Sequence, residues 1–130
     1  MEKLTILKRE LELLKTHLTR SNLSDFNKKT LLNELKTAIV VKGDRLPPDV
    51  ICLESKVEIA DVETGQKFKF QIVLPSEANM KLNRISVFAP IGIALLGYKI
   101  GSKVQWEMPN GLKTFEVLGV EQKSLSQELT

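Results

Sequence analysis

The apolar residues of this chain follow two different periods, and the change between them falls near residue 45. In the first part, leucines recur at alternating spacings of three and four residues, at Leu4, Leu7, Leu11, Leu14 and Leu18. On a repeat of about 3.5 residues these are successive a and d positions, which give one apolar seam along a helix. From Val50 onward, apolar and polar residues tend to alternate, which is typical of strands. We therefore predict an α+β protein in which a helical segment precedes an antiparallel sheet.

The helical part is predicted to be an antiparallel α-helical hairpin, or short coiled coil, over residues 1–43. The residues SNLS at 21–24 interrupt the leucine pattern, and Ser24 can cap a second helix with Asp25 in its first turn. A second apolar face then continues through roughly Val40 and comprises Phe26, Leu31, Leu32, Leu35, Ala38 and Ile39. The connection between the two predicted helices, around residues 21–24, is short enough for an αα-hairpin. We expect the leucine seam to pack within the hairpin or on its neighbour, and homodimerisation through the seam stays open as an alternative.

A short linker is predicted between the two parts, at residues 42–49, KGDRLPPD. Gly43 can adopt the left-handed conformation that ends a helix, and the two prolines cannot continue one. The helical domain is therefore expected at residues 1–43 and the sheet domain at residues 50–123. Residues 124–130 are expected to form a tail.

The sheet domain is predicted to hold one helix among its strands. Period-two or short apolar segments between turn residues predict strands at residues 56–61, 67–73, 85–88, 104–108 and 114–118. Pro90 fits the first position of a helix that Gly97 ends, and Gly92 inside that helix indicates close packing. Residues 109–111, Pro-Asn-Gly, are typical of a hairpin turn. The simplest assembly is one antiparallel sheet with this helix across a face.

Composition excludes several classes of protein. The longest uncharged run, residues 85–98, contains a proline and two glycines and is too short to cross a bilayer, so no membrane association is expected. The net charge is only +3, with 19 basic residues dispersed among 16 acidic ones, which predicts a mixed surface and no direct nucleic-acid contact as the main activity. A single cysteine, Cys52, excludes an internal disulfide and fits the reducing cytoplasm.

Residues for ordinary catalysis are scarce. His17 is the only histidine and is expected on the outer face of the first helix, and Cys52 is expected to be a small buried apolar side chain. One histidine and one cysteine provide little material for a transition-metal site or a Cys-His dyad. The glycines do not fit a phosphate-binding loop. We therefore expect a protein that is not an enzyme and that needs no cofactor or metal.

Residues 86–111, SVFAPIGIALLGYKIGSKVQWEMPNG, resemble the C-terminal domain of the bacterial GreA/GreB family of transcript-cleavage factors. The positions that match the family pattern are Ile85, Ser86, Val87, Pro90, residues 94–97, Gly101, Val104, Pro109 and Gly111. Upstream segments at residues 62–65, 70–73 and 77–79 extend the resemblance over about residues 55–121. Ala89 replaces the serine that precedes the family's proline, and this form resembles the Rnk-like branch, named for regulators of nucleoside diphosphate kinase.

The resemblance implies an FKBP-like domain that binds RNA polymerase at the rim of its secondary channel, through a coiled coil of the β′ subunit. In the family, the segment around the Ser-Pro turn belongs to this contact, which assigns Phe88, Ala89, Pro90 and Ile91 to the interface. Taken as residues alone, Phe88 and Ile91 are equally compatible with ordinary core packing. The fold does not by itself imply prolyl isomerase activity.

The predicted hairpin differs from that of the cleavage factors, which carry paired acidic residues at the tip of a long coiled coil. Residues 18–29, LTRSNLSDFNKK, hold one acid, Asp25, beside Ser24 at the expected tip. Chelation of a catalytic Mg²⁺ requires closely placed carboxylates. We therefore expect a transcription regulator that competes with Gre cleavage factors without stimulating cleavage. The alternative is a protein–protein adaptor in nucleotide metabolism that does not bind polymerase and holds its partner on the leucine seam.

Overall fold

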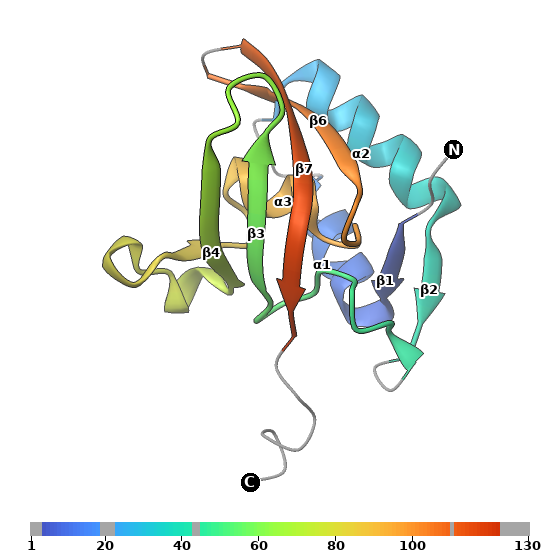
Figure 1. Cartoon of the computed structure of the whole chain (residues 1–130). Helices are drawn as coiled ribbons and strands as arrows, with labels where there is room; N and C mark the ends of the chain where they lie inside the picture. The colour runs from blue at the N-terminus through green and yellow to red at the C-terminus, as the bar shows by residue number, and fades with distance from the viewer. Residues whose placement is uncertain (1–3, 19–22, 43–44, 110, 123–130) are drawn as a thin grey trace, which may run out of the picture.

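The computed structural model describes residues 4–18, 23–42, 45–109 and 111–122 (Figure 1). These residues form a mixed α+β fold with one five-stranded sheet, in the order β5-β4-β3-β7-β6, and one two-stranded sheet, β1-β2. The elements along the chain are β1 (Thr5–Leu7), α1 (Lys8–Leu18), α2 (Asp25–Thr37), β2 (Ile39–Val41), β3 (Lys56–Asp61), β4 (Lys67–Val73), β5 (Arg84–Ser86), α3 (Pro90–Leu95), β6 (Lys103–Met108) and β7 (Gly111–Glu121).

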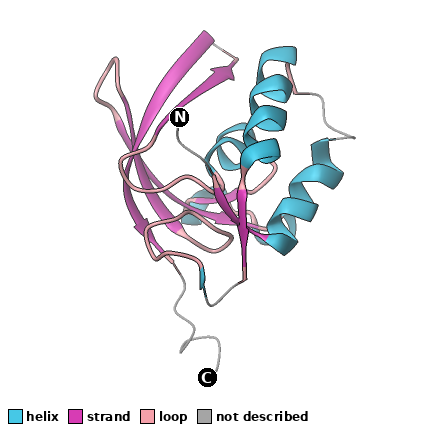
Figure 2. Ribbon diagram, turned by 90° about the vertical axis from the view of Figure 1, so that its right-hand side faces the viewer, coloured by secondary structure: helices cyan, strands magenta, loops and turns pink. Residues whose placement is uncertain are grey.

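The five-stranded sheet forms one layer, and the helices lie on one side of it (Figure 2). Successive side chains of a strand point to opposite faces of the sheet, so a strand in which apolar and polar residues alternate has one apolar face, and this face packs against the helices. In β3, Val57 and Ile59 are buried, whereas Lys56 is exposed and Glu58 is half-buried. The predicted strands at residues 56–61 and 67–73 are confirmed, because both alternating segments pair side by side as β3 and β4.

The start of the first helix is corrected by the structure. Residues Thr5–Leu7 form a strand that pairs in parallel with β2, and α1 begins only at Lys8. Beside its ladder with β2, two further hydrogen bonds hold this strand, one from the Thr5 N–H to the Gly97 carbonyl at 3.1 Å and one from the Ile39 N–H to the Leu4 carbonyl at 2.7 Å. These partners are distant in sequence, so a helical leucine spacing could not reveal them. The second helix likewise ends at Thr37, and Ile39 belongs to β2.

The leucine seam is buried in a core that both parts of the chain share. Its described side chains at positions 4, 7, 11 and 14 are at most 8 % exposed. They join sheet and α3 residues in one cluster that includes Leu4, Leu11, Leu14, Leu31, Ile51, Ile59, Ile93, Leu95 and Trp106. The seam therefore packs on its own chain, and these four leucines offer no exposed surface for a homodimer. The boundaries at residues 43 and 50 stay a prediction, and the predicted tail at 124–130 lies outside the described residues.

Helix α2 is anchored on the edge strand β6 by one buried side chain, Asn27, which is 4 % exposed. Its Nδ2 donates to the Glu107 carbonyl and its Oδ1 accepts from the Glu107 N–H, each at 2.8 Å. The amide thus satisfies both backbone groups of Glu107, as a neighbouring strand would. The antiparallel pairing of α1 with α2 stays a prediction, since residues 19–22 between them are outside the described part of the chain.

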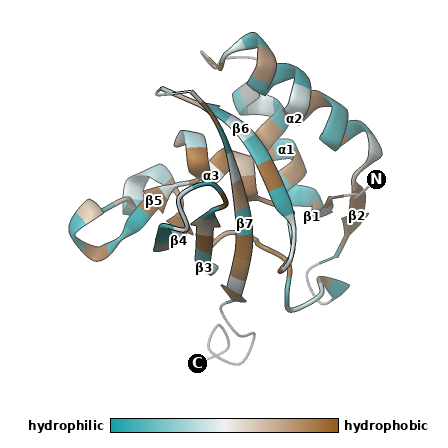
Figure 3. Ribbon diagram, turned by 45° about the horizontal axis from the view of Figure 1, so that its top comes forward, coloured by the Kyte–Doolittle hydropathy of each residue, from teal (hydrophilic) through white to brown (hydrophobic). Residues whose placement is uncertain are grey.

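The five-stranded sheet is not purely antiparallel, contrary to the prediction. β5 runs parallel to β4, with Ile72 opposite Ile85. Two short 3-10 turns, Pro75–Glu77 and Met80–Leu82, lie in the crossover that brings the chain back to the same end of the sheet. This crossover projects from the body, and its apolar segments are visible in Figure 3. The third strand also ends at Ser86, two residues before the predicted Phe88.

Glu10 on α1 is a buried carboxyl group, 1 % exposed. Its Oε2 accepts from the Leu53 N–H at 3.1 Å, and its Oε1 has no hydrogen-bond partner in the described residues. Burial raises the pKa of Glu10 above 4.5, against smaller lowering effects of the Leu53 hydrogen bond and the Arg9 charge. The folded state therefore binds this proton more tightly than the unfolded chain. Glu10 therefore contributes to the free energy of unfolding below its ordinary pKa, and this contribution is lost as pH rises through the raised pKa of the folded state.

Replacing this carboxyl by an amide, Glu10→Gln, is expected to increase the free energy of unfolding at pH 7 by about 1 kcal/mol. The gain arises because no charge is then buried, and it should disappear near pH 4, where Glu10 is protonated in the folded protein. Urea denaturation at the two pH values measures it. Glu12→Gln, on an exposed position of the same helix, is the matched control. Equal pH dependence of Glu10→Gln and the unaltered protein would contradict this account.

Candidate partner-binding site

The four residues that the family resemblance assigns to an interface lie together at the turn between β5 and α3. Ser86 builds this turn, because its Oγ accepts from the Phe88 N–H at 3.1 Å and its carbonyl accepts from the Ala89 N–H at 2.9 Å. Val87 points inward and is fully buried, and its N–H donates to the Val73 carbonyl at 2.7 Å. The turn is therefore held to the sheet at its base while the following residues reach the surface.

Helix α3 begins at Pro90, as predicted. Ala89 precedes it with an extended backbone, φ −65° and ψ 153°, and the fixed φ of proline suits the first helical position. Pro90 is exposed, whereas Phe88, Ala89 and Ile91 are half-buried. Phe88 and Ile91 also pack against the core cluster. Each of these two side chains thus has one part in the core and one part at the surface. We call residues 88–91 the α3 patch.

The position of His17 is the clearest correction at this site. Its imidazole does not lie isolated on the outer face of α1, because it stacks on the Phe88 ring with centroids 4.1 Å apart and planes 11° apart. Both side chains are half-buried. The contact joins the last turn of α1 to the α3 patch. Sequence reasoning missed it because no local pattern relates two residues so far apart in the chain.

Close packing at Gly92 fixes α3 against the turn, as the sequence predicted. A Cβ atom at this position would lie 2.5 Å from the Ser86 carbonyl oxygen, which is far inside van der Waals contact. Gly97, the predicted end of the helix, has φ +90°, a conformation that favours glycine. The two glycines therefore set where α3 lies and where it ends.

The expected hairpin tip is only partly described. Ser24 caps α2, since its Oγ accepts from the Asn27 N–H at 3.2 Å, and Asp25 is the first helical residue. These local predictions are confirmed. Residues 19–22 lie outside the described part of the chain, and the functional role of Ser24 and Asp25 stays a prediction.

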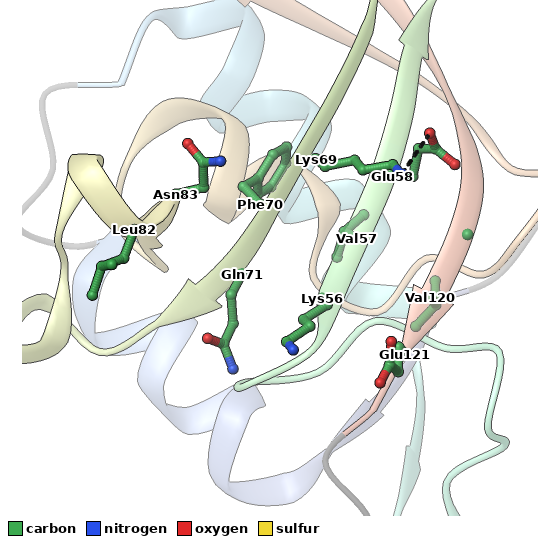
Figure 4. A pocket seen from close by; sticks show the side chains of 11 residues that line it. Lys56, Val57, Glu58, Lys69, Phe70, Gln71, Leu82, Asn83, Val120 and Glu121 are labelled. Carbon is green, nitrogen blue, oxygen red and sulfur yellow. Dashed lines mark ion pairs between the residues drawn. The ribbon is translucent and has the colours of Figure 1, made fainter.

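A second feature is an open hollow of about 490 Å³ on the outer face of the sheet (Figure 4). Side chains of both charges line it, and Lys69 Nζ lies 3.9 Å from Glu58 Oε2. Leu82, 61 % exposed, lines its margin from the crossover. Lysine and glutamate side chains in a wide, solvated hollow are typical of an ordinary mixed surface. We therefore take the α3 patch as the candidate site.

Cys52 is half-buried, and not fully buried as the sequence predicted. It lies in the turn before β3, where its N–H donates to Ser55 Oγ at 3.0 Å. Within residues that the structure describes, no three His, Cys, Asp or Glu side chains gather as a metal site would require. No described helix is long and apolar enough to cross a membrane.

The domain that carries the α3 patch has a recognised family. Residues 46–122 match the sequence model described as "Transcription elongation factor, GreA/GreB, C-term". This match covers more than half of the chain and includes the whole patch. The chain therefore belongs to the GreA/GreB transcription elongation factor family, as the sequence resemblance indicated.

Individual relatives agree with this assignment. The transcription elongation factor GreA of Clostridium beijerinckii is 38 % identical over 90 residues, 69 % of this chain and 56 % of that protein. The regulator of nucleoside diphosphate kinase of Escherichia coli is 34 % identical over 89 residues, 68 % of this chain and 65 % of that protein. The chain thus matches less than two thirds of the length of either relative.

A solved structure supports the fold over nearly the whole chain. It is the transcription elongation factor GreA/GreB of Nitrosomonas europaea, with a TM-score of 0.69 and 27 % sequence identity. The similarity covers 93 % of this chain and 99 % of that one. The α+β architecture is therefore a family property, while the description of the sheet domain as FKBP-like stays a prediction.

Gly92→Ala is expected to destabilise the protein by about 1–3 kcal/mol, because its Cβ collides with backbone that cannot rotate away. Gly119→Ala is the matched control, since its Cβ would meet only Glu58 Cβ, at an ordinary 3.7 Å. Alanine there is expected to be neutral or slightly stabilising. Thermal and urea unfolding of both variants measure the difference. Equal stabilities would contradict the close packing of α3 on Ser86.

Proposed function

We propose that this protein is a non-enzymatic transcription regulator that binds RNA polymerase near its secondary channel through the α3 patch. The observation that carries the proposal is the exposure of Pro90, between half-buried Ala89 and Ile91, on a domain that matches the family. Apolar side chains that are partly exposed beside an exposed helix start can enter an interface without unfolding the core. The β′ coiled coil is the proposed partner element.

The amino-terminal part of the chain, residues 1–41, which we call the arm, supports a role without cleavage. Asp25 is the only acid in residues 18–29, and it lies in the first turn of α2, where a negative charge is favoured by the helix dipole. A single carboxylate is a poor ligand set for a catalytic Mg²⁺. We therefore propose that the bound protein obstructs Gre cleavage factors and does not stimulate transcript cleavage itself.

The alternative hypothesis, a protein–protein adaptor, requires an exposed leucine seam as its binding surface. Leu4 and Leu14 of this seam are at most 1 % exposed in the shared core, so the seam is not available to a partner. Deleting residues 1–41 would also remove these core side chains, so a truncated protein cannot separate the two hypotheses. Point substitutions on the surface are required instead.

Pro90→Glu tests the proposed interface. Glutamate is tolerated in the first turn of a helix, but its charge would be buried without a partner in an apolar contact. We expect the Kd for purified RNA polymerase to increase at least about tenfold, which corresponds to about 1.4 kcal/mol. Val62→Glu, at a residue outside the patch that is 45 % exposed, is the control and should bind as the unaltered protein does. Unchanged binding by Pro90→Glu would refute the assignment of the patch.

A competition assay tests the activity. With stalled polymerase complexes and a GreA protein that stimulates cleavage, increasing amounts of this protein should slow cleavage until it is suppressed. The protein alone should leave cleavage at the rate seen with polymerase only. Inhibition should be lost with Pro90→Glu in proportion to its weaker binding. Strong stimulation of cleavage by the protein alone would overturn the proposal.

A further inference from the structure

We propose that His17 is a positioning residue of the α3 patch, which makes the arm helix α1 part of the partner-binding surface. The proposal depends on the function proposed above, because the patch is taken as the site that contacts polymerase. It adds a residue from outside the sequence region that matches the family, since that match begins at residue 46. The main observation in its support is the stacked contact between the His17 and Phe88 rings.

The Phe88 side chain is restrained on one side by the core and on the other by His17. Its backbone is held through its N–H, which donates to Ser86 Oγ, and its ring packs partly against the core cluster. The imidazole lies at 4.1 Å and nearly parallel, at 11°, so it covers one face of the phenyl ring. Without this cover the ring would have a solvent-exposed face and more freedom to leave its position.

Helix α1 is a rigid support for this contact. Leu11 and Leu14, within the two turns before His17, are 8 % and 0 % exposed and belong to the shared core. Within the same helix, Lys15 and Thr16 are exposed, so the chain reaches the surface immediately before the histidine. The stack therefore restrains the Phe88 ring through a helix that is itself fixed by its buried leucines.

An ordered Phe88 favours binding by preorganisation. Immobilising a free side chain at an interface reduces affinity, and a ring that is already fixed in the unbound protein avoids this loss. Phe88 is itself the first residue of the patch, so a ring that leaves its position changes the apolar surface offered to the partner. A flat aromatic surface, and not the charge or hydrogen bonds of imidazole, is the property that this role requires.

The test compares His17→Ala, which removes the stack, with His17→Phe, which retains a flat ring. We expect His17→Ala to weaken polymerase binding by about three- to tenfold, and His17→Phe to restore it to within about twofold of the unaltered protein. Lys15→Ala, an exposed substitution in the same helix, is the control and should bind normally. All measurements are made at a temperature at which each variant is fully folded, as verified by its unfolding curve.

A second readout is independent of polymerase. In the free protein, the stack should shift the Phe88 ring proton resonances upfield through the ring current of His17, and His17→Ala should abolish this shift. If His17 only stabilised the fold, His17→Ala would alter the unfolding curve and leave the affinity of the folded protein unchanged, so phenylalanine would have no loss of binding to restore.

The outcomes separate this proposal from the function on which it depends. If the unaltered protein does not bind polymerase, the proposed function and the role of His17 both fail. If it binds and His17→Ala binds equally well, only the role of His17 fails. If His17→Phe does not restore binding, the imidazole has a direct polar role and positioning by stacking is refuted. An unchanged Phe88 resonance in His17→Ala would refute the stack itself.

Discussion

Backbone hydrogen bonds at Gly97 and Tyr98 join three distant segments of the chain, and the shared core depends on this junction. The Gly97 carbonyl accepts from the Thr5 N–H at 3.1 Å, and its N–H donates to the Ile51 carbonyl at 2.9 Å. The Ile51 N–H donates in turn to the Tyr98 carbonyl at 2.8 Å. A side chain at Gly97 would contact Leu4 and require an unfavourable φ. The amino-terminal strand, the segment before β3 and the end of α3 are thus bonded together, and the shared core closes around them.

Each edge strand of the sheet is contacted at one residue by a segment outside the regular ladder. On β6, the Asn27 amide takes the two hydrogen bonds that a further strand would make with Glu107. On β5, Asn79 from the crossover exchanges two backbone hydrogen bonds with Arg84, each at 2.9 Å. Covered edges limit uncontrolled strand pairing between molecules.

The proposed site lies where the two parts of the chain meet. In sequence, the arm and the family-matching domain are separate, and it is natural to assign obstruction to one and docking to the other. In the structure, His17 of α1 stacks on Phe88 of the patch, and Leu14 lies in the common core. Helix α1 is therefore held beside the patch, so a protein bound through the patch would present this helix in one defined direction.

The sequence by itself determined what depends on neighbours along the chain: the alternating strands β3 and β4, the Ser24 cap and the start of α3 at Pro90. It also indicated the family, because the glycines and the two prolines of residues 85–111 have specific backbone and packing requirements. Only the tertiary structure decided the rest, including the strand β1, the parallel pairing of β5 and the surroundings of His17. These features depend on hydrogen bonds and contacts between distant segments, whose free energy exceeds the local preference of a leucine repeat for helix.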